Sequence, residues 1–307
     1  MNPLKVVVMG YGHLGKWHAQ KVSMCTEATL YAIVEPVESN KLVAQSTYPD
    51  TKVVSHIGEV IRECDVVFIV TPTSTHYSVL KEVLKFEKHI FCEKPLCALE
   101  AEAKEIVELA KLKPSIKIQV GHSERFHPLV AILKNLMDQS KDNTYCLEFI
   151  RVTSPKGRAL DVHVTDDIMI HDVDLLLHVF KKSILSSYPI GFKMHSTNLD
   201  FVDVTLELQD GGKARLKSCR EEVEEMRVIH FYHKMGHYKF DLMNYTWSSV
   251  DAGNIKLHSV QKRDHLLEEH KTFYSAIINN QTVAVSATEA LENISFLSKI
   301  HQTLGIS

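Results

Sequence analysis

The sequence has no long hydrophobic run and no excess of basic residues. No window approaches the ~18 apolar residues that a membrane-spanning helix needs, and the apolar run at the N-terminus is too short for the core of a signal peptide. The chain has 35 Lys and Arg against 38 Asp and Glu, a formal net charge of −3. It therefore lacks the basic surplus typical of nucleic-acid binding. We expect a cytoplasmic protein with no membrane or nucleic-acid partner.

Cysteine is also sparse: the six cysteines are scattered, without a CxxC pair or the spacing of a zinc finger. Most stand in apolar segments, where a reduced thiol packs like a small hydrophobic side chain. The pattern predicts a reducing compartment and no metal site. At 307 residues, 45% of them hydrophobic and 24% charged, the chain is long enough for two globular domains.

A glycine-rich turn directly follows the first apolar run and reads, from position 9 to 15, Met-Gly-Tyr-Gly-His-Leu-Gly. Gly10 would let the chain turn tightly, Gly12 would leave room for a pyrophosphate, and Gly15 would let the next helix pack closely. The phosphates would lie at the helix N-terminus beside His13 and Leu14, where N–H groups and the helix dipole favour an anion. A glycine turn without a ligand is the alternative for this motif alone.

An acidic residue stands where a dinucleotide site needs one. A β-branched and aromatic run at 29–34 predicts a buried strand, and Glu35 ends it, 20 positions after Gly15. A carboxylate there accepts hydrogen bonds from the ribose hydroxyls of adenosine and repels a 2′-phosphate. Because residues 36–38 supply no arginine for that phosphate, we predict NAD rather than NADP. The alternative is a solvated acid at a strand end.

Strand and helix patterns alternate through the first part of the chain. The predicted strands are 4–8, 29–34, 53–55, 65–70, 89–92 and 116–120, and the predicted helices are 57–62, 78–86 and 98–111. Repeated strand–helix units indicate an α/β fold with a doubly wound parallel sheet. We therefore predict an N-terminal NAD-binding Rossmann domain over residues 1–122.

The pattern changes after position 122, where longer alternating strands appear. They are predicted at 145–153, 203–208, 213–219, 226–233 and 237–242, with helices at 264–279 and 288–304. Alternation suits an open, mostly antiparallel sheet with one exposed face. We predict a second α/β domain over residues 123–307, which binds the substrate.

Two segments follow predicted strands at the carboxyl edge of the sheet, where ligands bind in this architecture. The first would contact the cofactor through Thr71, Thr73 and His76. The second contains Glu93 and Lys94, and it places the lysine ammonium where the nicotinamide and the substrate would meet. An ordinary surface lysine is the alternative.

A polar stripe lies on the helix predicted after position 164. Asp167, His171, Asp174 and His178 share one face at i, i+4, i+7 and i+11, while apolar residues line another. Such a stripe suggests a lined cavity, and a solvated face is the alternative. Oxidation of a secondary alcohol removes a hydride and a proton, so it needs a base near neutrality. His171 suits that role, Asp167 could fix its tautomer, and Lys94 could stabilise the alkoxide.

Together these motifs resemble the Gfo/Idh/MocA family, the glucose–fructose oxidoreductase and inositol dehydrogenase group. The resemblance extends over nearly the whole chain and rests on an ordered set: the glycine turn, His18, Thr71-Pro72 with His76, Glu93-Lys94-Pro95, Asp167 with His171, and Asp174. It implies that Lys94 orients the reacting hydroxyl while Asp167 and His171 assist proton transfer. It also implies pairing through the open sheet, as a homodimer or homotetramer.

The stretch 120–128, VGHSERFHP, resembles the GH-x-ERFNP segment of a subgroup that oxidises C3 of UDP-N-acetylglucosamine-type sugars, towards the diamino sugars of cell-surface glycans. This resemblance implies a UDP-sugar bound by His122, Arg125, Arg151, Arg158 and Asp174, with arginines on the diphosphate. His122 and Arg125 could instead support the domain junction.

Three other functions stay open. One is a dehydrogenase of a free sugar or inositol, and another is an NAD-binding regulator without turnover. The third is a metal-dependent hydrolase that uses Asp167, His171, Asp172 and Asp174. On a regular helix Asp172 would project about 100° from His171, which disfavours the metal site.

Overall fold

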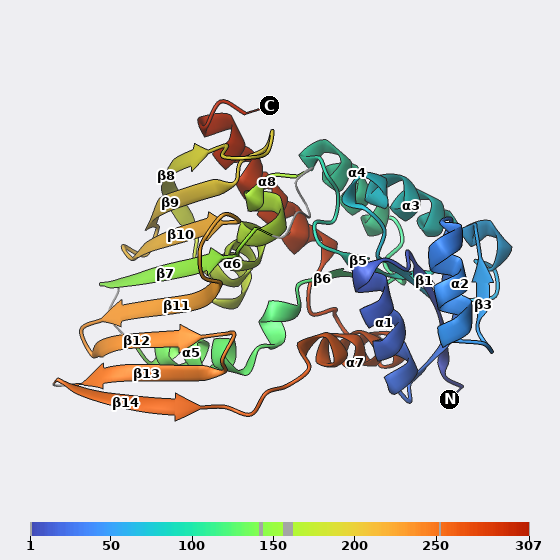
Figure 1. The fold of residues 1–307 in the computed structure, drawn as a ribbon, viewed down its shortest axis with the longest axis horizontal. Coiled ribbons are helices and arrows are strands. Elements are labelled where there is room, and N and C mark those ends of the chain that lie inside the picture. Colours follow the sequence, from blue (N-terminus) through green and yellow to red (C-terminus); the bar gives the residue numbers. More distant parts are fainter. Residues whose placement is uncertain (1, 141–143, 156–161, 252, 307) are drawn as a thin grey trace. The chain divides into compact units, whose positions relative to one another are not determined.

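The computed structural model describes residues 2–140, 144–155, 162–251 and 253–306. These form two compact units (Figure 1). The first contains Met1–Ser123 with Asp264–Glu292, and the second contains Glu124–Arg263 with Asn293–Ser307. In the described ranges no helix combines the length and hydrophobicity needed to cross a membrane.

The first unit contains a six-stranded sheet in the order β3-β2-β1-β4-β5-β6. Its strands are β1 (Leu4–Met9), β2 (Ala28–Val34), β3 (Lys52–Val54), β4 (Val66–Ile69), β5 (His89–Glu93) and β6 (Ile118–Gly121). Every neighbouring pair is parallel. The buried parts of the central strands, such as 6–9 in β1 and 66–69 in β4, are apolar because both faces of such a sheet are covered. This order is that of a dinucleotide-binding fold, with its switch point between β1 and β4, so the predicted fold class is confirmed.

Helices connect these strands. They are α1 (His13–Met24), α2 (Glu38–Thr47), α3 (Thr73–Lys85) and α4 (Glu100–Lys111). The expectation of a helix at 57–62 is wrong, because only a short 3₁₀ turn forms at Ile57–Glu59. Helix α2 was not predicted from the sequence. Its only buried residue is Ala44, so it lacks the apolar period on which such predictions depend.

Helix α7 (His265–Ile278) belongs to the first unit although it follows the second in sequence. Phe273 and Tyr274 of α7 are 0% exposed and pack in the same core as Phe68 and Phe91. The segment after α7 also bonds to β6, where the Val120 amide donates to the Val285 carbonyl at 3.1 Å. The predicted single boundary between residues 122 and 123 therefore does not account for residues 264–292, with which the chain returns to the first unit.

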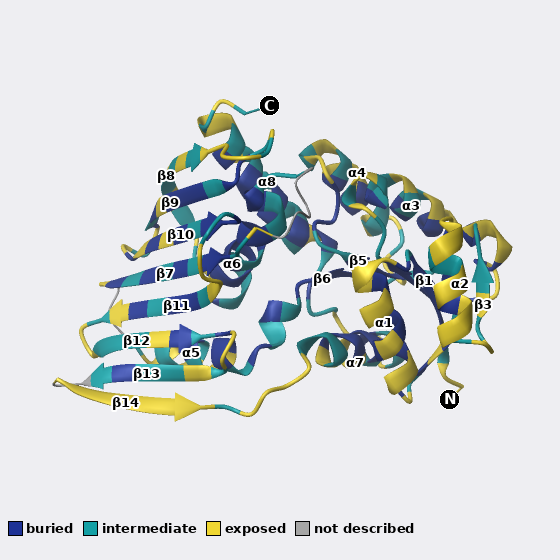
Figure 2. Ribbon diagram, in the orientation of Figure 1, coloured by how far each residue is buried: buried dark blue, intermediate teal, exposed yellow. Residues whose placement is uncertain are grey.

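The second unit contains an eight-stranded sheet in the order β14-β13-β12-β11-β7-β10-β9-β8. The strands are β7 (Tyr145–Val152), β8 (Ile184–Phe192), β9 (Phe201–Leu208), β10 (Lys213–Cys219), β11 (Met226–His233), β12 (Gly236–Asp241), β13 (Thr246–Asp251) and β14 (Asn254–Ser259). Only the β7–β10 pair among them is parallel. The mostly antiparallel sheet is therefore confirmed. Strand β14 is exposed along its length (Figure 2).

Helix α5 (Pro128–Gln139), the helical stretch 165–179 and the end of α8 (Ala287–Thr303) complete this unit. Their apolar side chains form one core with the inward residues of the sheet, including Leu133, Val173, Phe149 and Ile300. Strands β8, β13 and β14 were not predicted from the sequence.

Candidate active site

The glycine turn has the geometry that a dinucleotide site needs. Gly10 has φ +87°, and a Cβ there would lie 2.5 Å from the Val70 carbonyl oxygen. A Cβ on Gly15 would lie 2.0 Å from the Gly10 carbonyl oxygen, so only glycine lets α1 start this close to the turn. A Cβ on Gly12 would meet no atom within 4 Å. This open space is where a pyrophosphate could approach the backbone, and it lies beside the exposed residues His13 and Leu14 at the start of α1.

Glu35 directly follows β2 and also accepts a hydrogen bond from the glycine turn. Its Oε2 accepts a hydrogen bond from the Tyr11 amide at 2.7 Å, and its Oε1 accepts one from the Val37 amide at 2.9 Å. Each carboxylate oxygen has two lone-pair sites, so both retain acceptor capacity for ribose hydroxyls. The sequence did not reveal the bond to Tyr11, because it joins positions 24 apart.

A cation that sequence reasoning missed lies on α2. The Lys41 ammonium is 3.2 Å from the Ser55 hydroxyl and 3.2 Å from the Glu38 carboxylate. Ser55 follows Val54, whose carbonyl accepts the Glu35 amide. Lys41 lies outside the 36–38 stretch, whose lack of an arginine is the basis for predicting NAD.

His76 is 1% exposed, and its ring connects two loops at the carboxyl edge of the sheet. Nδ1 lies 2.8 Å from the Pro95 carbonyl oxygen and Nε2 lies 3.0 Å from the Thr71 carbonyl oxygen. His76 therefore joins the two loops through their backbone carbonyls, whereas the sequence predicted that it contacts the cofactor. Thr71 accepts a bond from the Thr75 hydroxyl at 2.7 Å, and Thr73 is the first residue of α3.

Glu93 is the last residue of β5 and Lys94 follows it, at the same carboxyl edge as the glycine turn. Glu93 Oε2 accepts the Lys94 amide at 3.1 Å, and Glu93 Oε1 lies 2.8 Å from His18 Nε2. Burial raises the pKa of the Glu93 carboxyl, but its hydrogen bond to His18 and the nearby positive groups hold that pKa below its ordinary value. The carboxylate form therefore persists beside the lysine.

In the second unit, Asp167 and His171 lie on an irregular helical stretch. A π-helical turn at Thr165–Met169 leads into α6 (Ile170–Asp174), and a second π-helical turn follows at Leu175–Val179. Both side chains are half-buried. Turns of this kind are frequent at functional sites. The expectation of a regular helix is therefore wrong in detail, while the helical character is correct.

The rest of the predicted polar stripe is bonded inside the second unit. The Arg125 guanidinium makes a bidentate pair with Asp174, at 2.7 Å from Nε and 2.6 Å from Nη2. Asn293 donates to Asp174 at 2.9 Å, and its Oδ1 lies 3.0 Å from His178 Nε2. Asp174 is 0% exposed. These contacts give Arg125 and Asp174 a structural role within the second unit, whereas the sequence predicted that both bind the substrate.

Arg151 lies in a buried ion cluster. It donates to Asp172 through Nε and Nη2, at 3.0 Å and 2.8 Å, and to Glu124 through Nη1 at 3.1 Å. Arg227 donates to the same Glu124 oxygen at 2.6 Å. Although burial raises the pKa of Glu124, the two guanidiniums hold it at about 2. All three donor nitrogens of Arg151 thus bond to carboxylates of the chain, a use that the sequence did not indicate.

Two other residues, His122 and Arg158, were also predicted to bind the substrate. His122 follows β6 and is 1% exposed, with its amide bonded to the Val120 carbonyl. Arg158 lies outside the described residues. Among the described residues no group of three or more His, Cys, Asp or Glu side chains is placed to hold a metal ion.

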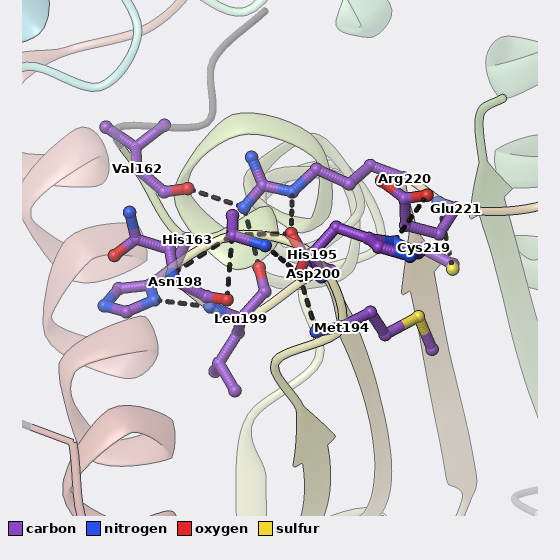
Figure 3. A network of polar contacts seen from close by, with 11 residues as sticks. Val162, His163, Met194, His195, Asn198, Leu199, Asp200, Cys219, Arg220 and Glu221 are labelled. Carbon is purple, nitrogen blue, oxygen red and sulfur yellow. Dashed lines mark hydrogen bonds and ion pairs between the residues drawn. The ribbon is translucent and has the colours of Figure 1, made fainter. Parts of the chain in front are cut away.

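A polar network anchors the entry to the helical stretch that carries Asp167 and His171 (Figure 3). Arg220 Nε is 3.0 Å from Asp200 Oδ1, and Arg220 Nη2 donates to the Val162 and Leu199 carbonyls at 2.6 and 2.7 Å. Asp200 Oδ2 also accepts the backbone amides of residues 194–196. Although burial raises the pKa of Asp200, these hydrogen bonds lower it to about 2. The network fixes the chain just before Thr165.

The first unit is similar to a known family of oxidoreductases. Residues 4–122 match the model of the Gfo/Idh/MocA oxidoreductase family, which has an NAD-binding Rossmann fold. The UDP-N-acetylglucosamine 3-dehydrogenase of Acidithiobacillus ferrooxidans is 26% identical over 293 residues, covering 92% of this chain and 91% of that protein. The myo-inositol 2-dehydrogenase of Thermotoga maritima is 25% identical and covers 93% of this chain and 92% of that protein.

A solved structure of the Acidithiobacillus enzyme superposes with a TM-score of 0.89 at 24% identity, over 99% of this chain and 98% of that chain. The structural likeness confirms the two-part fold for the whole chain. The predicted resemblance to the Gfo/Idh/MocA family is confirmed by the match of residues 4–122 to the family model and by the near full-length similarity to the Acidithiobacillus dehydrogenase.

Proposed function

We propose that this chain, whose residues 4–122 belong to the NAD-binding Rossmann fold of the Gfo/Idh/MocA oxidoreductase family, is an NAD-dependent dehydrogenase of a sugar hydroxyl. One observation carries the proposal. The open backbone at Gly12 and the carboxylate of Glu35 follow β1 and β2 at the carboxyl edge of a parallel sheet, where dinucleotides bind in this architecture, and Lys94 follows β5 at the same edge.

The chemistry divides among the chain's own residues. NAD, when bound, accepts the hydride from carbon. The backbone of the glycine turn and the N-terminus of α1 bind its phosphates, and Glu35 accepts the ribose hydroxyls. Lys94 orients the reacting hydroxyl and stabilises negative charge on its oxygen. His171 takes the proton, and Asp167 orients the imidazole.

The substrate that we propose is a UDP-N-acetylhexosamine, oxidised at C3. The support is the GHSERF segment at 121–126 together with the near full-length similarity to a UDP-N-acetylglucosamine 3-dehydrogenase. Similar coverage by a myo-inositol 2-dehydrogenase makes a free cyclitol or sugar the alternative.

A diphosphate needs an accessible cation, and Arg227 is the best candidate in the ion cluster of the second unit. Its side chain is 43% exposed, against 5% for Arg151 and 10% for Arg125. We therefore expect Arg227→Met to raise the KM for a UDP-sugar much more than the KM for NAD. Equal effects on both KM values would show that Arg227 does not bind the substrate.

The function is tested by incubating the purified protein with NAD and a panel of UDP-sugars, free sugars and inositols while following NADH absorbance. An aminotransferase that consumes the keto product must be present, because an unfavourable equilibrium would hide turnover. We expect Lys94→Ala and His171→Ala to lower turnover by ~10²–10⁴, with NADH affinity within several-fold of wild type. Lys85→Ala, at the exposed end of α3, is the matched lysine control.

Two results would change the proposal. Near-wild-type turnover in both variants would remove these residues from the chemistry, and NADH binding without turnover of any substrate would favour a regulator. Activity on inositol or glucose with none on UDP-sugars would leave the dehydrogenase in place and replace its substrate.

A further inference from the structure

Two histidines lie in the phenylalanine-rich core of the first unit. His18 of α1 and His270 of α7 are both 0% exposed. Their rings lie 5.3 and 5.6 Å from the ring of Phe91, and 5.8 and 4.6 Å from that of Phe68. Burying an imidazole in such surroundings is unfavourable unless its nitrogens are hydrogen-bonded. Two histidines buried in this core therefore need hydrogen-bond partners within the protein.

The two rings form a chain of polar contacts that ends at Glu93. His270 Nε2 lies 2.9 Å from His18 Nδ1, and His18 Nε2 lies 2.8 Å from Glu93 Oε1. The other carboxylate oxygen of Glu93 accepts the Lys94 amide at 3.1 Å. This series of contacts thus connects the core between α1 and α7 to the backbone of Lys94, the lysine to which we assign a role in the reaction.

The proton positions follow from the acceptors. A carboxylate only accepts hydrogen bonds, so His18 Nε2 must carry the proton that bonds to Glu93. A neutral His18 then accepts at Nδ1, and His270 donates from Nε2. Burial lowers the pKa of His270 well below its ordinary value, which favours its neutral form. His270 Nδ1 is then an acceptor, and no hydrogen-bond partner reaches it within the described part of the chain.

The position of the Glu93 carboxylate is fixed on its far side as well. A Cβ on Gly121, at the end of β6, would lie 2.9 Å from Glu93 Oε1, so any other residue would displace the carboxylate. Glu93 is therefore enclosed by His18 and by the adjacent strand end, and its side chain is 12% exposed. The carboxylate therefore lies between His18 and the strand end at Gly121, where the absence of a Cβ leaves room for it.

We propose that His18 and His270 are positioning residues for the reaction: His270 fixes the tautomer of His18, and His18 holds Glu93 so that it orients the peptide leading into Lys94. The inference rests on the proposed role of Lys94 in the chemistry. A lysine displaced by about 1 Å from its productive place can cost on the order of 100-fold in rate. The pair therefore acts on turnover through Glu93 and touches neither substrate nor cofactor.

The kinetic test compares removal of each hydrogen bond with its partial restoration. We expect His18→Leu to lower kcat about 10- to 100-fold, with the KM for NAD and the affinity for NADH within a few-fold of wild type. His270→Leu should lower kcat in the same direction. His18→Gln, whose amide Nε2–H can reach Glu93, should recover most of the lost turnover. Phe91→Leu is the matched control, because it disturbs packing around both rings without removing a polar contact; it should lower Tm and leave kcat close to wild type.

An independent readout is ¹⁵N NMR of histidine-labelled protein without substrate. We expect His18 protonated at Nε2 and accepting at Nδ1, and we expect His270→Leu to alter the His18 nitrogen shifts. A His18 that carries its proton on Nδ1 alone would overturn the proposal. So would a wild-type kcat in His18→Leu, or an equal loss of kcat in Phe91→Leu. If the wild-type protein oxidises no sugar, the proposed function fails, while the NMR result still decides whether the chain of contacts exists.

Discussion

At the scale of single residues, the three glycines of the turn have separable roles. A Cβ on Gly15 would lie 2.0 Å from a backbone oxygen, and a Cβ on Gly12 would lie in open space. Gly12 has φ −72°, which alanine adopts without strain. We predict that Gly15→Ala lowers Tm sharply, because backbone must move. Gly12→Ala should keep the wild-type Tm and lose NADH affinity at least tenfold. Thermal unfolding and NADH fluorescence titration measure the two effects.

The opposite result for Gly12 would be informative. If Gly12→Ala binds NADH as wild type does, the pyrophosphate does not approach this part of the backbone. The position of the cofactor along the sheet edge would then need to be reassigned.

Two side chains near the end of β2, those of Glu35 and Lys41, provide a prediction about cofactor choice. We predict tighter binding of NADH than of NADPH, because Glu35 repels a 2′-phosphate. Glu35→Gln should narrow that difference, since the amide has no charge. Lys41→Ala should weaken the binding of NADPH but not that of NADH, because the Lys41 ammonium is a nearby cation that could move from Glu38 and Ser55 to the 2′-phosphate. Titration of both reduced cofactors checks this, and equal affinities in the wild-type protein would contradict it.

Residue roles set by local sequence could be predicted, and roles set by distant contacts could not. The positive φ of Gly10 and the close approach of Gly15 to the Gly10 carbonyl are both set within the turn, so the spacing of the glycines was sufficient. Arg125 meets a carboxylate 49 positions away, and no pattern in the sequence indicates which acid will face which guanidinium. The same holds for His270, which meets His18 across 252 positions.

At the scale of elements, strongly apolar strands were predictable and polar or irregular ones were not. Residues 6–9 of β1, 66–69 of β4 and 90–92 of β5 are continuous apolar runs, whereas α2 has one buried residue. In the stretch 165–179, a regular 3.6-residue period predicted one polar face. The two π-helical turns interrupt that period, and Asp172 and Asp174 both become buried and bond to different arginines.

The network around Asp200 provides a prediction about stability at low pH. The pKa of this buried carboxyl is about 2 in the folded protein, against ~3.9 in an unfolded chain. Its contribution is therefore complete above pH ~4 and is lost as the pH falls towards 2, a loss of about 2 kcal/mol. We expect the unfolding free energy of the wild-type protein to fall in this window, and that of Asp200→Asn to start lower and to fall less.

Urea unfolding followed from pH 5 to pH 2 measures the difference. Asp50→Asn, at an exposed position, is the matched control and should follow the wild-type curve. Parallel curves for wild type and Asp200→Asn would mean that the Arg220 and backbone contacts do not stabilise the ionised carboxylate.

At the scale of the whole molecule, the chain leaves the first unit after Ser123 and returns to it at Asp264. The amphipathic pattern of α7 indicates that one face is buried, but it does not indicate against which core. Phe273 and Tyr274 fill the space beside Phe68 and Phe91, and Lys21 of α1 pairs with Asp264 at 2.7 Å. The dinucleotide-binding unit is therefore discontinuous in sequence.

A fragment comparison tests this organisation. Burying a large apolar side chain contributes ~1.5–3 kcal/mol, so the loss of Phe273, Tyr274 and the smaller contacts of α7 removes an amount comparable to a domain's whole stability of ~5–15 kcal/mol. We predict that residues 1–123 alone do not unfold cooperatively and do not bind NADH. The same residues joined to 264–292 through a long, flexible Gly/Ser linker should do both, as measured by circular dichroism and NADH fluorescence. A Phe273→Ala, Tyr274→Ala version of the linked fragment separates the effect of packing from that of chain length, and it should behave like 1–123. Cooperative folding and NADH binding by 1–123 alone would show that α7 covers a core already complete without it.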